Sequence, residues 1–248
     1  MTTESQEQIP PSLVLVLFAT RLSALVEEGV SFVRAFHSLR DTPEPYGAES
    51  VRLQEALEAG DTLSDAMLGR RELYSRYFIA MVHAGEVGGI IDVTLRIAAD
   101  IITKEWRLLN QALGTETELL LAAPSTKYVP ENWSKLSYYQ RTTNMYLFCE
   151  TWGSLLGSGV PILRSMDVVA ELLPRVQAEQ LFAAKRAISA GERINAARIE
   201  GLPPFVAALI DQGEERGTLD MTLVKAADVL LIELDALAMS GPRQQPTS

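Results

Sequence analysis

Four carboxylates lie in a short pattern that occurs twice in the chain, and their types and spacing make them candidates for chemistry. Residues 84–92 read AGEVGGIID and residues 212–220 read QGEERGTLD, so the frame G-E-x-x-G-x-[IL]-D recurs after 128 positions. Carboxylate oxygens accept hydrogen bonds and bind hard cations. We therefore take the residues that the two frames share as interaction candidates: Gly85, Glu86, Gly89, Asp92, Gly213, Glu214, Gly217 and Asp220.

The frame also has a purely structural interpretation. Gly85 can adopt the left-handed conformation that ends a helix, and Gly89 can start the next helix because glycine is an acceptable N-cap. The carboxylates then lie near the start of a long helix, whose dipole favours each negative charge by roughly 0.3–1 kcal/mol. This interpretation explains the glycines better than the glutamates, since an N-cap accepts Ser, Asp or Asn equally well. The structural role and the interaction role therefore both stay open.

Few other residues could carry catalysis. The two histidines, His37 and His83, fall in predicted helices, where a lone histidine is usually a hydrogen-bonded packing residue. The single cysteine, Cys149, cannot form an internal disulfide or a metal cluster, and we interpret it as a core residue of a protein from a reducing compartment. The sequence contains no HExxH, GxxxxGK[ST], GxSxG or GxGxxG motif. We therefore predict a protein that is not an enzyme and that needs no cofactor.

Composition narrows the classes of partner. The chain has 22 Lys plus Arg against 32 Asp plus Glu, a formal charge of −10, so phosphate backbones and anionic lipid should repel it. The basic pair Arg70-Arg71 is interpreted as a solvated face. The apolar run Leu13–Ala19 is far shorter than the roughly 18 residues that a membrane span needs, and no basic residue precedes it as in a secretory signal. We expect a cytoplasmic protein that does not bind nucleic acid.

The elements that must position the two frames are helices. Apolar residues recur at helical spacing through the first 110 residues, interrupted by the helix-stop signals Gly29, Gly60 and Gly85, and they predict six helices. Thr62 with Asp65 three residues later resembles an N-cap box and predicts a short helix. No alternating run predicts a strand.

The second half repeats this order. Gly159, Gly191 and Gly213 follow Gly29, Gly60 and Gly85 after 130, 131 and 128 positions. Aligning residues 77–105 with residues 205–233 gives eleven identities in twenty-nine positions, whereas ordinary composition gives roughly two. An internal duplication accounts for both observations.

The predicted fold class is therefore all-α, with two tandem six-helix antiparallel bundle domains related by internal duplication. The predicted boundaries are 12–110 for the first domain, 111–144 for a linker, 145–239 for the second domain and 240–248 for a disordered tail.

In its ordered motifs the chain resembles the F protein of type II secretion and type IV pilus systems. The motifs of the first copy are FATRLSAL at residues 18–25, Gly29-Val30, GDTL at residues 60–63, Phe78 and GEVGGII at residues 85–91. Those of the second copy are residues 152–156, GVPI at residues 159–162, GERI at residues 191–194, Phe205 and GEERGTL at residues 213–219.

The resemblance implies two copies of an all-α cytoplasmic domain and a non-catalytic scaffold that works by protein–protein interaction. Family members carry membrane-spanning helices after each domain, and this sequence has none, so we expect a soluble relative docked at the cytoplasmic face of the inner membrane. The implied partners are other secretion or pilus assembly components, including the motor ATPase, and a second copy in a homodimer. The alternative is a regulatory binding module or decoy that acts on the same machinery.

The resemblance also implies the possibility of calcium at a pairing surface. Four residues after Glu86 and Glu214, however, stand Ile90 and Thr218. Because calcium needs several hard oxygen ligands, no metal site is predicted.

Overall fold

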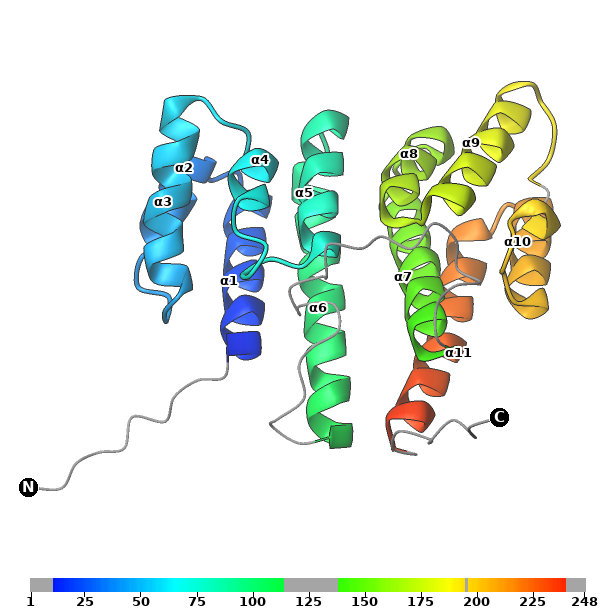
Figure 1. Cartoon of the computed structure of the whole chain (residues 1–248). Helices are drawn as coiled ribbons and strands as arrows, with labels where there is room; N and C mark the ends of the chain where they lie inside the picture. Colours follow the sequence, from blue (N-terminus) through cyan, green and yellow to red (C-terminus); the bar gives the residue numbers. More distant parts are fainter. Residues whose placement is uncertain (1–10, 114–137, 195, 240–248) are drawn as a thin grey trace, which may run out of the picture. The chain divides into compact units, whose positions relative to one another are not determined.

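The computed structural model of the chain describes residues 11–113, 138–194 and 196–239, and every regular element in these ranges is a helix (Figure 1), which confirms the predicted all-α class. The predicted tail 240–248 and most of the predicted linker 111–144 lie outside these ranges. Helix α7 begins at Tyr138, inside the predicted linker. None of the helices in the described ranges combines the length and the apolar character needed to cross a membrane.

Contacts divide the described residues into two compact units. The first unit contains residues 11–82 and 98–113, and the second contains residues 83–97 together with the described part of 138–239. The chain therefore passes from one unit to the other within α5 and again within α6. The domain limits 12–110 and 145–239 stay a prediction.

The first unit is built from short helices around a cluster of aromatic rings. Its helices are α1 (Pro11–Glu27), α2 (Phe32–Ser38), α3 (Tyr46–Ala59), α4 (Leu63–Leu68), the first part of α5 (Arg76–Gly88) and the second part of α6 (Ile91–Leu113). The ring of Phe18 stacks on that of Tyr46 with centroids 4.9 Å apart, and Tyr74 stacks on Phe78 at 5.9 Å. Such pairs add about 0.5–1.5 kcal/mol to the burial of their surface.

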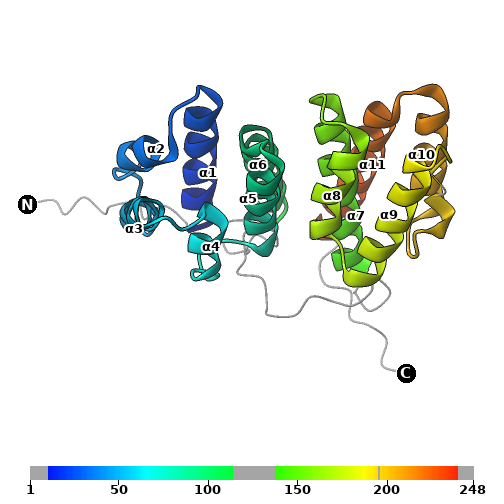
Figure 2. The same cartoon turned by 90° about the horizontal axis from the view of Figure 1, so that it is seen from above.

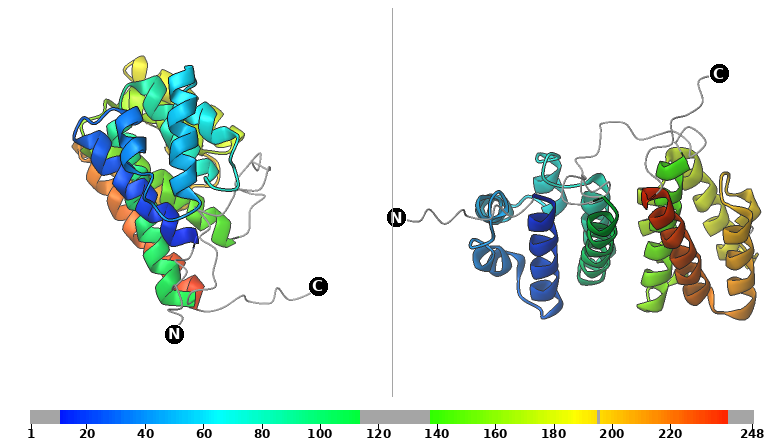
Figure 3. Two further views of the ribbon diagram at one scale, coloured as in Figure 1. Left: turned by 90° about the vertical axis from the view of Figure 1, so that its left-hand side faces the viewer. Right: turned by 90° about the horizontal axis from the view of Figure 1, so that it is seen from below.

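The second unit is organised around two long helices that lie side by side, α7 and α11, as Figures 2 and 3 show. Its elements are the end of α5, the start of α6, α7 (Tyr138–Gly157), α8 (Ile162–Leu172), α9 (Arg175–Ser189), the 3₁₀ helix η2 (Ala196–Arg198), α10 (Pro204–Arg216) and α11 (Leu219–Met239). A Cβ atom at Gly153 of α7 would lie 2.8 Å from Cγ2 of Val224 and 3.0 Å from the carbonyl oxygen of Asp220. The glycine therefore lets α7 approach α11 closely.

The two halves differ at their shortest helix. In α4 the Thr62 hydroxyl accepts a hydrogen bond from the Asp65 amide at 3.1 Å, which confirms the predicted N-cap. The position 131 residues later holds Arg193, whose side chain has no acceptor, and Pro203-Pro204 follow. The described part of the second half accordingly has five α-helices and the single turn of η2, where we predicted a sixth helix.

Candidate interaction site

Helix-ending glycines recur with the same backbone geometry in both halves. Gly29 and Gly159 have φ values of 78° and 82°. The Gly29 amide donates to the Val26 carbonyl at 2.9 Å, and the next amide, that of Val30, donates to the Leu25 carbonyl at 2.9 Å. This pair of bonds is the Schellman motif. The same two bonds occur at Gly159, Gly60, Gly191, Gly89 and Gly217.

Within the frame, the second glycine ends the helix and the first does not. Gly89 and Gly217 have φ values of 60° and 67°, and each follows the last residue of its helix, α5 or α10. Gly85 lies inside α5, so our prediction that Gly85 ends this helix was wrong. The left-handed residue is Gly89, one turn later. Its conformation lets the next amide, that of Ile90, donate to the carbonyl of Gly85 at 3.0 Å.

Gly85 and Gly213 are instead positions of close helix contact. A Cβ atom at Gly85 would lie 2.1 Å from the Thr94 hydroxyl oxygen and 2.8 Å from Cα of Ile91. A Cβ atom at Gly213 would lie 2.0 Å from the Thr222 hydroxyl oxygen and 2.9 Å from Cα of Leu219. No side chain larger than hydrogen fits at either crossing. The shared Thr94/Thr222 pair in the repeat alignment was the one sequence signal of this contact.

Glu214 has a defined structural partner. Both of its carboxylate oxygens accept the backbone N–H of Ile194, at 2.8 and 2.9 Å, and the half-buried side chain thereby ties α10 to the loop after α9. One turn earlier, Asp211 accepts from the Ala196 amide at 3.3 Å. The side chain of Glu214 thus reaches the Ile194 amide of this loop, which gives the Glu of the second frame a structural role other than helix capping. Glu86 is likewise half-buried near the end of α5.

The two aspartates lie at helix starts, as predicted. Asp92 is in the first turn of α6 and Asp220 is in the first turn of α11. Asp92 is exposed, and so is Val87, whose side chain is the most exposed large apolar one among the described residues, at 74%. The frame of the first half thus combines a buried glycine with an accessible apolar and acidic edge. Binding of a partner at these residues stays a prediction.

The cysteine is a core residue. Cys149 is fully buried in α7, and burial, followed by the nearby charge of Glu150, raises the pKa of its thiol far above the ordinary value. The thiol therefore stays protonated, which suits packing and not nucleophilic attack. Within the described ranges, no three His, Cys, Asp or Glu side chains are grouped as a metal ion would need.

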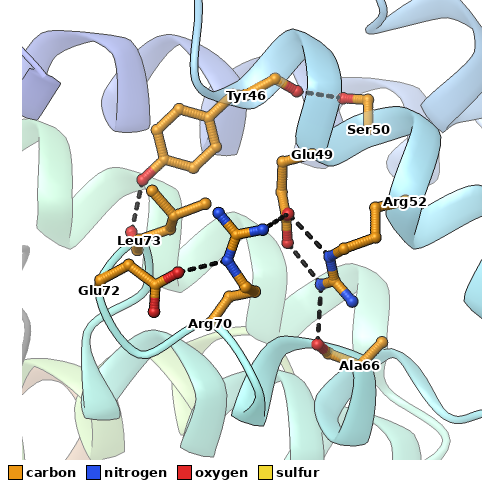
Figure 4. A network of polar contacts seen from close by, with 8 residues as sticks. All are labelled: Tyr46, Glu49, Ser50, Arg52, Ala66, Arg70, Glu72 and Leu73. Carbon is orange, nitrogen blue, oxygen red and sulfur yellow. Dashed lines mark hydrogen bonds and ion pairs between the residues drawn. The ribbon is translucent and has the colours of Figure 1, made fainter.

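A polar network in the first unit was missed by sequence reasoning (Figure 4). Glu49 of α3 is buried, with a side chain only 1% exposed, and it accepts from Nε and Nη2 of Arg52 at 2.9 and 2.6 Å. Arg70 approaches the same carboxylate at 3.5 Å and also pairs with Glu72. Arg70 is thus tied to α3, which corrects our interpretation of this residue as part of a solvated face, whereas Arg71 is exposed as interpreted. The i,i+3 spacing of Glu49 and Arg52 was visible in the sequence, but it is also common on exposed helix surfaces.

The network holds α4 and the loop that follows it against α3. Arg52 donates to the carbonyl of Ala66 at 2.8 Å, and the Tyr46 hydroxyl donates to the carbonyl of Leu73. Burial, and then the charge of Glu49, raises the pKa of both Tyr46 and Tyr74, so both phenols are neutral at physiological pH. The hydrogen bond to Glu49 raises the pKa of Arg52.

The second unit ties the corresponding loop with neutral groups. Gln177 and Gln180 stand 131 positions after Tyr46 and Glu49. The fully buried Gln177 donates to the carbonyl of Glu200 at 3.0 Å, and Gln180 accepts from the Glu200 amide at 2.8 Å. Equivalent positions in the two halves thus attach the loop after the short helix by different chemistry.

Known proteins of one family are similar to both halves of the chain. The family model described as "Type II secretion system (T2SS), protein F" matches residues 18–125 and 148–238. A type IV pilus assembly protein PilC of Myxococcus xanthus is 22% identical over 298 residues, covering 90% of this chain and 72% of the relative. A type II secretion system protein F of Xanthomonas campestris is 22% identical over 295 residues, covering 88% and 73%. PilC of Thermus thermophilus is 23% identical over 303 residues, covering 91% and 74%.

Proposed function

Because the chain belongs to the type II secretion system protein F family, as its motifs predicted, we propose that it is a non-catalytic scaffold of a type II secretion or type IV pilus machine. The observation that carries this proposal is the match of one family model to both halves, residues 18–125 and 148–238. The matched region includes nearly all of the described helices, so the role is assigned to the helical body as a whole. Relatives named as pilus assembly and secretion proteins support the same role.

Repeated geometry supports two tandem domains that arose by duplication. The three pairs of helix-ending glycines share their sign of φ and their hydrogen bonds, and Gly85 and Gly213 make the same close contact to a threonine. Two copies of one frame give the chain two similar helical hairpins, α5–α6 and α10–α11. A scaffold with two such copies can hold two partners, or two parts of one partner, at once.

The features described at the two frames perform positioning and not bond-making chemistry. Gly85 and Gly213 set helix crossings, and Glu214 fixes a loop. Val87 and Asp92 are exposed residues of the first frame, and a partner can reach them. The expected partners are other components of the machine, including its motor ATPase, and a second copy of the chain. The expected location, taken from the family, is the cytoplasmic face of the inner membrane.

Affinity capture from cells tests this function. A gene that encodes the tagged chain replaces the native gene. Proteins are then cross-linked in the cell, and the captured proteins are identified by mass spectrometry. We expect secretion or pilus components among them, and we expect Val87→Glu with Asp92→Lys to reduce their capture at an unchanged unfolding midpoint. Asp100→Lys, at an exposed position of α6, is the matched control and should capture like the wild type.

Two results would contradict the scaffold. One is capture that contains no component of the machine, with secretion and piliation intact when the gene is deleted. The other is a deletion that increases secretion or piliation, because a scaffold is required for assembly whereas a decoy restrains it.

A further inference from the structure

A groove of about 490 Å³ lies in the second unit between α9, residues 192–194 with Arg198, and α10, and we call it the α9–α10 groove. Two of these three elements are held together by bonds already described, since Glu214 and Asp211 of α10 accept from the amides of Ile194 and Ala196. The groove is therefore a built feature of the fold. Its apolar floor comes from Ala184, Ala187 and Ile194.

The groove is lined by small residues at positions where the first half carries large ones. Ala183 and Ala184 stand 131 positions after Arg52 and Leu53, the same offset that relates Gly60 to Gly191. Leu53 is fully buried, whereas Ala183 is exposed and Ala184 half-buried. At these positions the first half thus carries a buried aliphatic side chain and Arg52, whose guanidinium bonds Glu49.

Charge favours a cationic occupant. Three carboxylates line the groove, those of Glu192, Asp211 and Glu214, against the guanidinium groups of Arg193 and Arg198. Arg193 pairs with Glu215, which is not among the lining residues, at 3.8 Å, so its charge is partly neutralised from outside the groove. An occupant with an apolar stem and a positive head can place the stem on the alanine floor and the head beside the carboxylates.

We propose that the α9–α10 groove receives an arginine side chain presented by a partner protein. Arginine fits better than lysine because its planar guanidinium bonds carboxylates in a fixed fork and is less strongly hydrated. The first half shows the chemistry within the same chain, where Arg52 donates to the carboxylate of Glu49 and to the carbonyl of Ala66. The proposal deepens the proposed function and rests on it only in taking the partner to be a protein.

The test uses the full chain, labelled with ¹⁵N, and a blocked pentapeptide, GGRGG, as the probe. We expect saturable amide shifts at Ala184, Ala187 and Ile194 that the matching citrulline peptide does not produce, because citrulline keeps the shape and lacks the charge. Asp211→Asn keeps the oxygen that accepts from Ala196 and should weaken binding by about two- to fivefold, the range of one exposed ion pair.

A filling variant distinguishes the groove from the acidic surface in general. Ala184→Leu restores the residue of the first half and should abolish the shifts while the unfolding midpoint stays within the range of the wild type. Equal shifts with the citrulline peptide, shifts that survive Ala184→Leu, or binding of inorganic phosphate at Arg198 in place of the peptide would each overturn the proposal. If the peptide fails to bind while capture of the machine persists, the groove proposal falls and the scaffold stands; the reverse result removes the scaffold and keeps the groove.

Discussion

At the scale of single residues, the two glycines that open the frames have the clearest physical role. Gly85 and Gly213 sit where a helix crosses the start of the next, and a Cβ atom there would overlap a threonine hydroxyl and a backbone Cα. Sequence reasoning found these glycines but assigned them to helix termination. The reason is that a close crossing depends on where two helices meet, which no local pattern reports, whereas Gly89 and Gly217 carry the termination signal one turn later.

Alanine at either crossing should destabilise the protein. Gly85→Ala and Gly213→Ala each force the helices apart, and we expect a loss of about 1–3 kcal/mol in the free energy of unfolding, as for other overpacked sites. Denaturant unfolding of the two variants measures it. Gly157→Ala is the matched control, since a Cβ atom there meets nothing within 4 Å and alanine suits a helix better. Equal free energies of unfolding for the variants Gly85→Ala and Gly157→Ala would show that the helix crossing is not as close as described.

Glu214 should stabilise the folded protein mainly because its oxygen accepts a hydrogen bond, and not through its charge alone. Glu214→Ala leaves the Ile194 amide without its acceptor and should cost roughly 1–3 kcal/mol. Glu214→Gln keeps one acceptor oxygen and should recover most of this loss. Hydrogen exchange at the Ile194 amide reports the bond directly, and slow exchange that persists in Glu214→Ala would argue against it.

Tyr74 predicts how stability depends on alkaline pH. Its pKa in the folded protein is raised above the ordinary value of 10.0 by burial, so folding keeps a proton that the unfolded chain releases. The stabilising contribution is complete below pH 10 and decreases as pH rises above it, because the unfolded state then binds fewer protons. The hydroxyl makes no hydrogen bond of standard geometry with the described residues. Tyr74→Phe should therefore change the free energy of unfolding little at pH 7 and make its decrease above pH 10 less steep. Urea unfolding at several pH values from 7 to 11 measures this free energy. The same dependence on pH in Tyr74→Phe and in the wild type would contradict the prediction.

At the scale of elements, the short fourth helix depends on its cap. Thr62→Ala removes the acceptor of the Asp65 amide and should cost about 1 kcal/mol, whereas Thr62→Ser should cost little. Amide exchange along α4 measures the effect, and exchange equally slow in both variants would contradict it. The absence of this cap at Arg193 is consistent with the reduction of the equivalent segment to η2.

Much of the element pattern was predictable because its causes are local. Glycine stops, an N-cap threonine and apolar spacing act within a few residues, so they predicted most of the helices, with the exceptions of the end of α5 and the helix expected where η2 lies. The buried Glu49 could not be predicted, because its environment is made by Arg70 and Tyr74 more than twenty positions away. The α9–α10 groove could not be predicted either. The sequence shows Ala184 at the position that aligns with Leu53, but whether this small residue lines a groove depends on how the surrounding helices pack.

At the scale of the whole molecule, the proposed scaffold role requires surfaces that partners can reach. The family match extends over both halves, and the two frames supply repeated hairpins whose accessible edge in the first copy is formed by Val87 and Asp92. In the second copy, Glu215 replaces Val87 and pairs with Arg193, so the two edges differ in chemistry. Two related but unequal surfaces suit a scaffold that contacts different components.

Photocross-linking in the cell tests this account most directly. A photoreactive amino acid at position 87 should form adducts with a secretion or pilus component or with a second copy of the chain. The same amino acid at Glu55, an exposed position of α3, should form far fewer of them. Equal adducts from both positions, or adducts at position 87 only with proteins outside the machine, would contradict the scaffold.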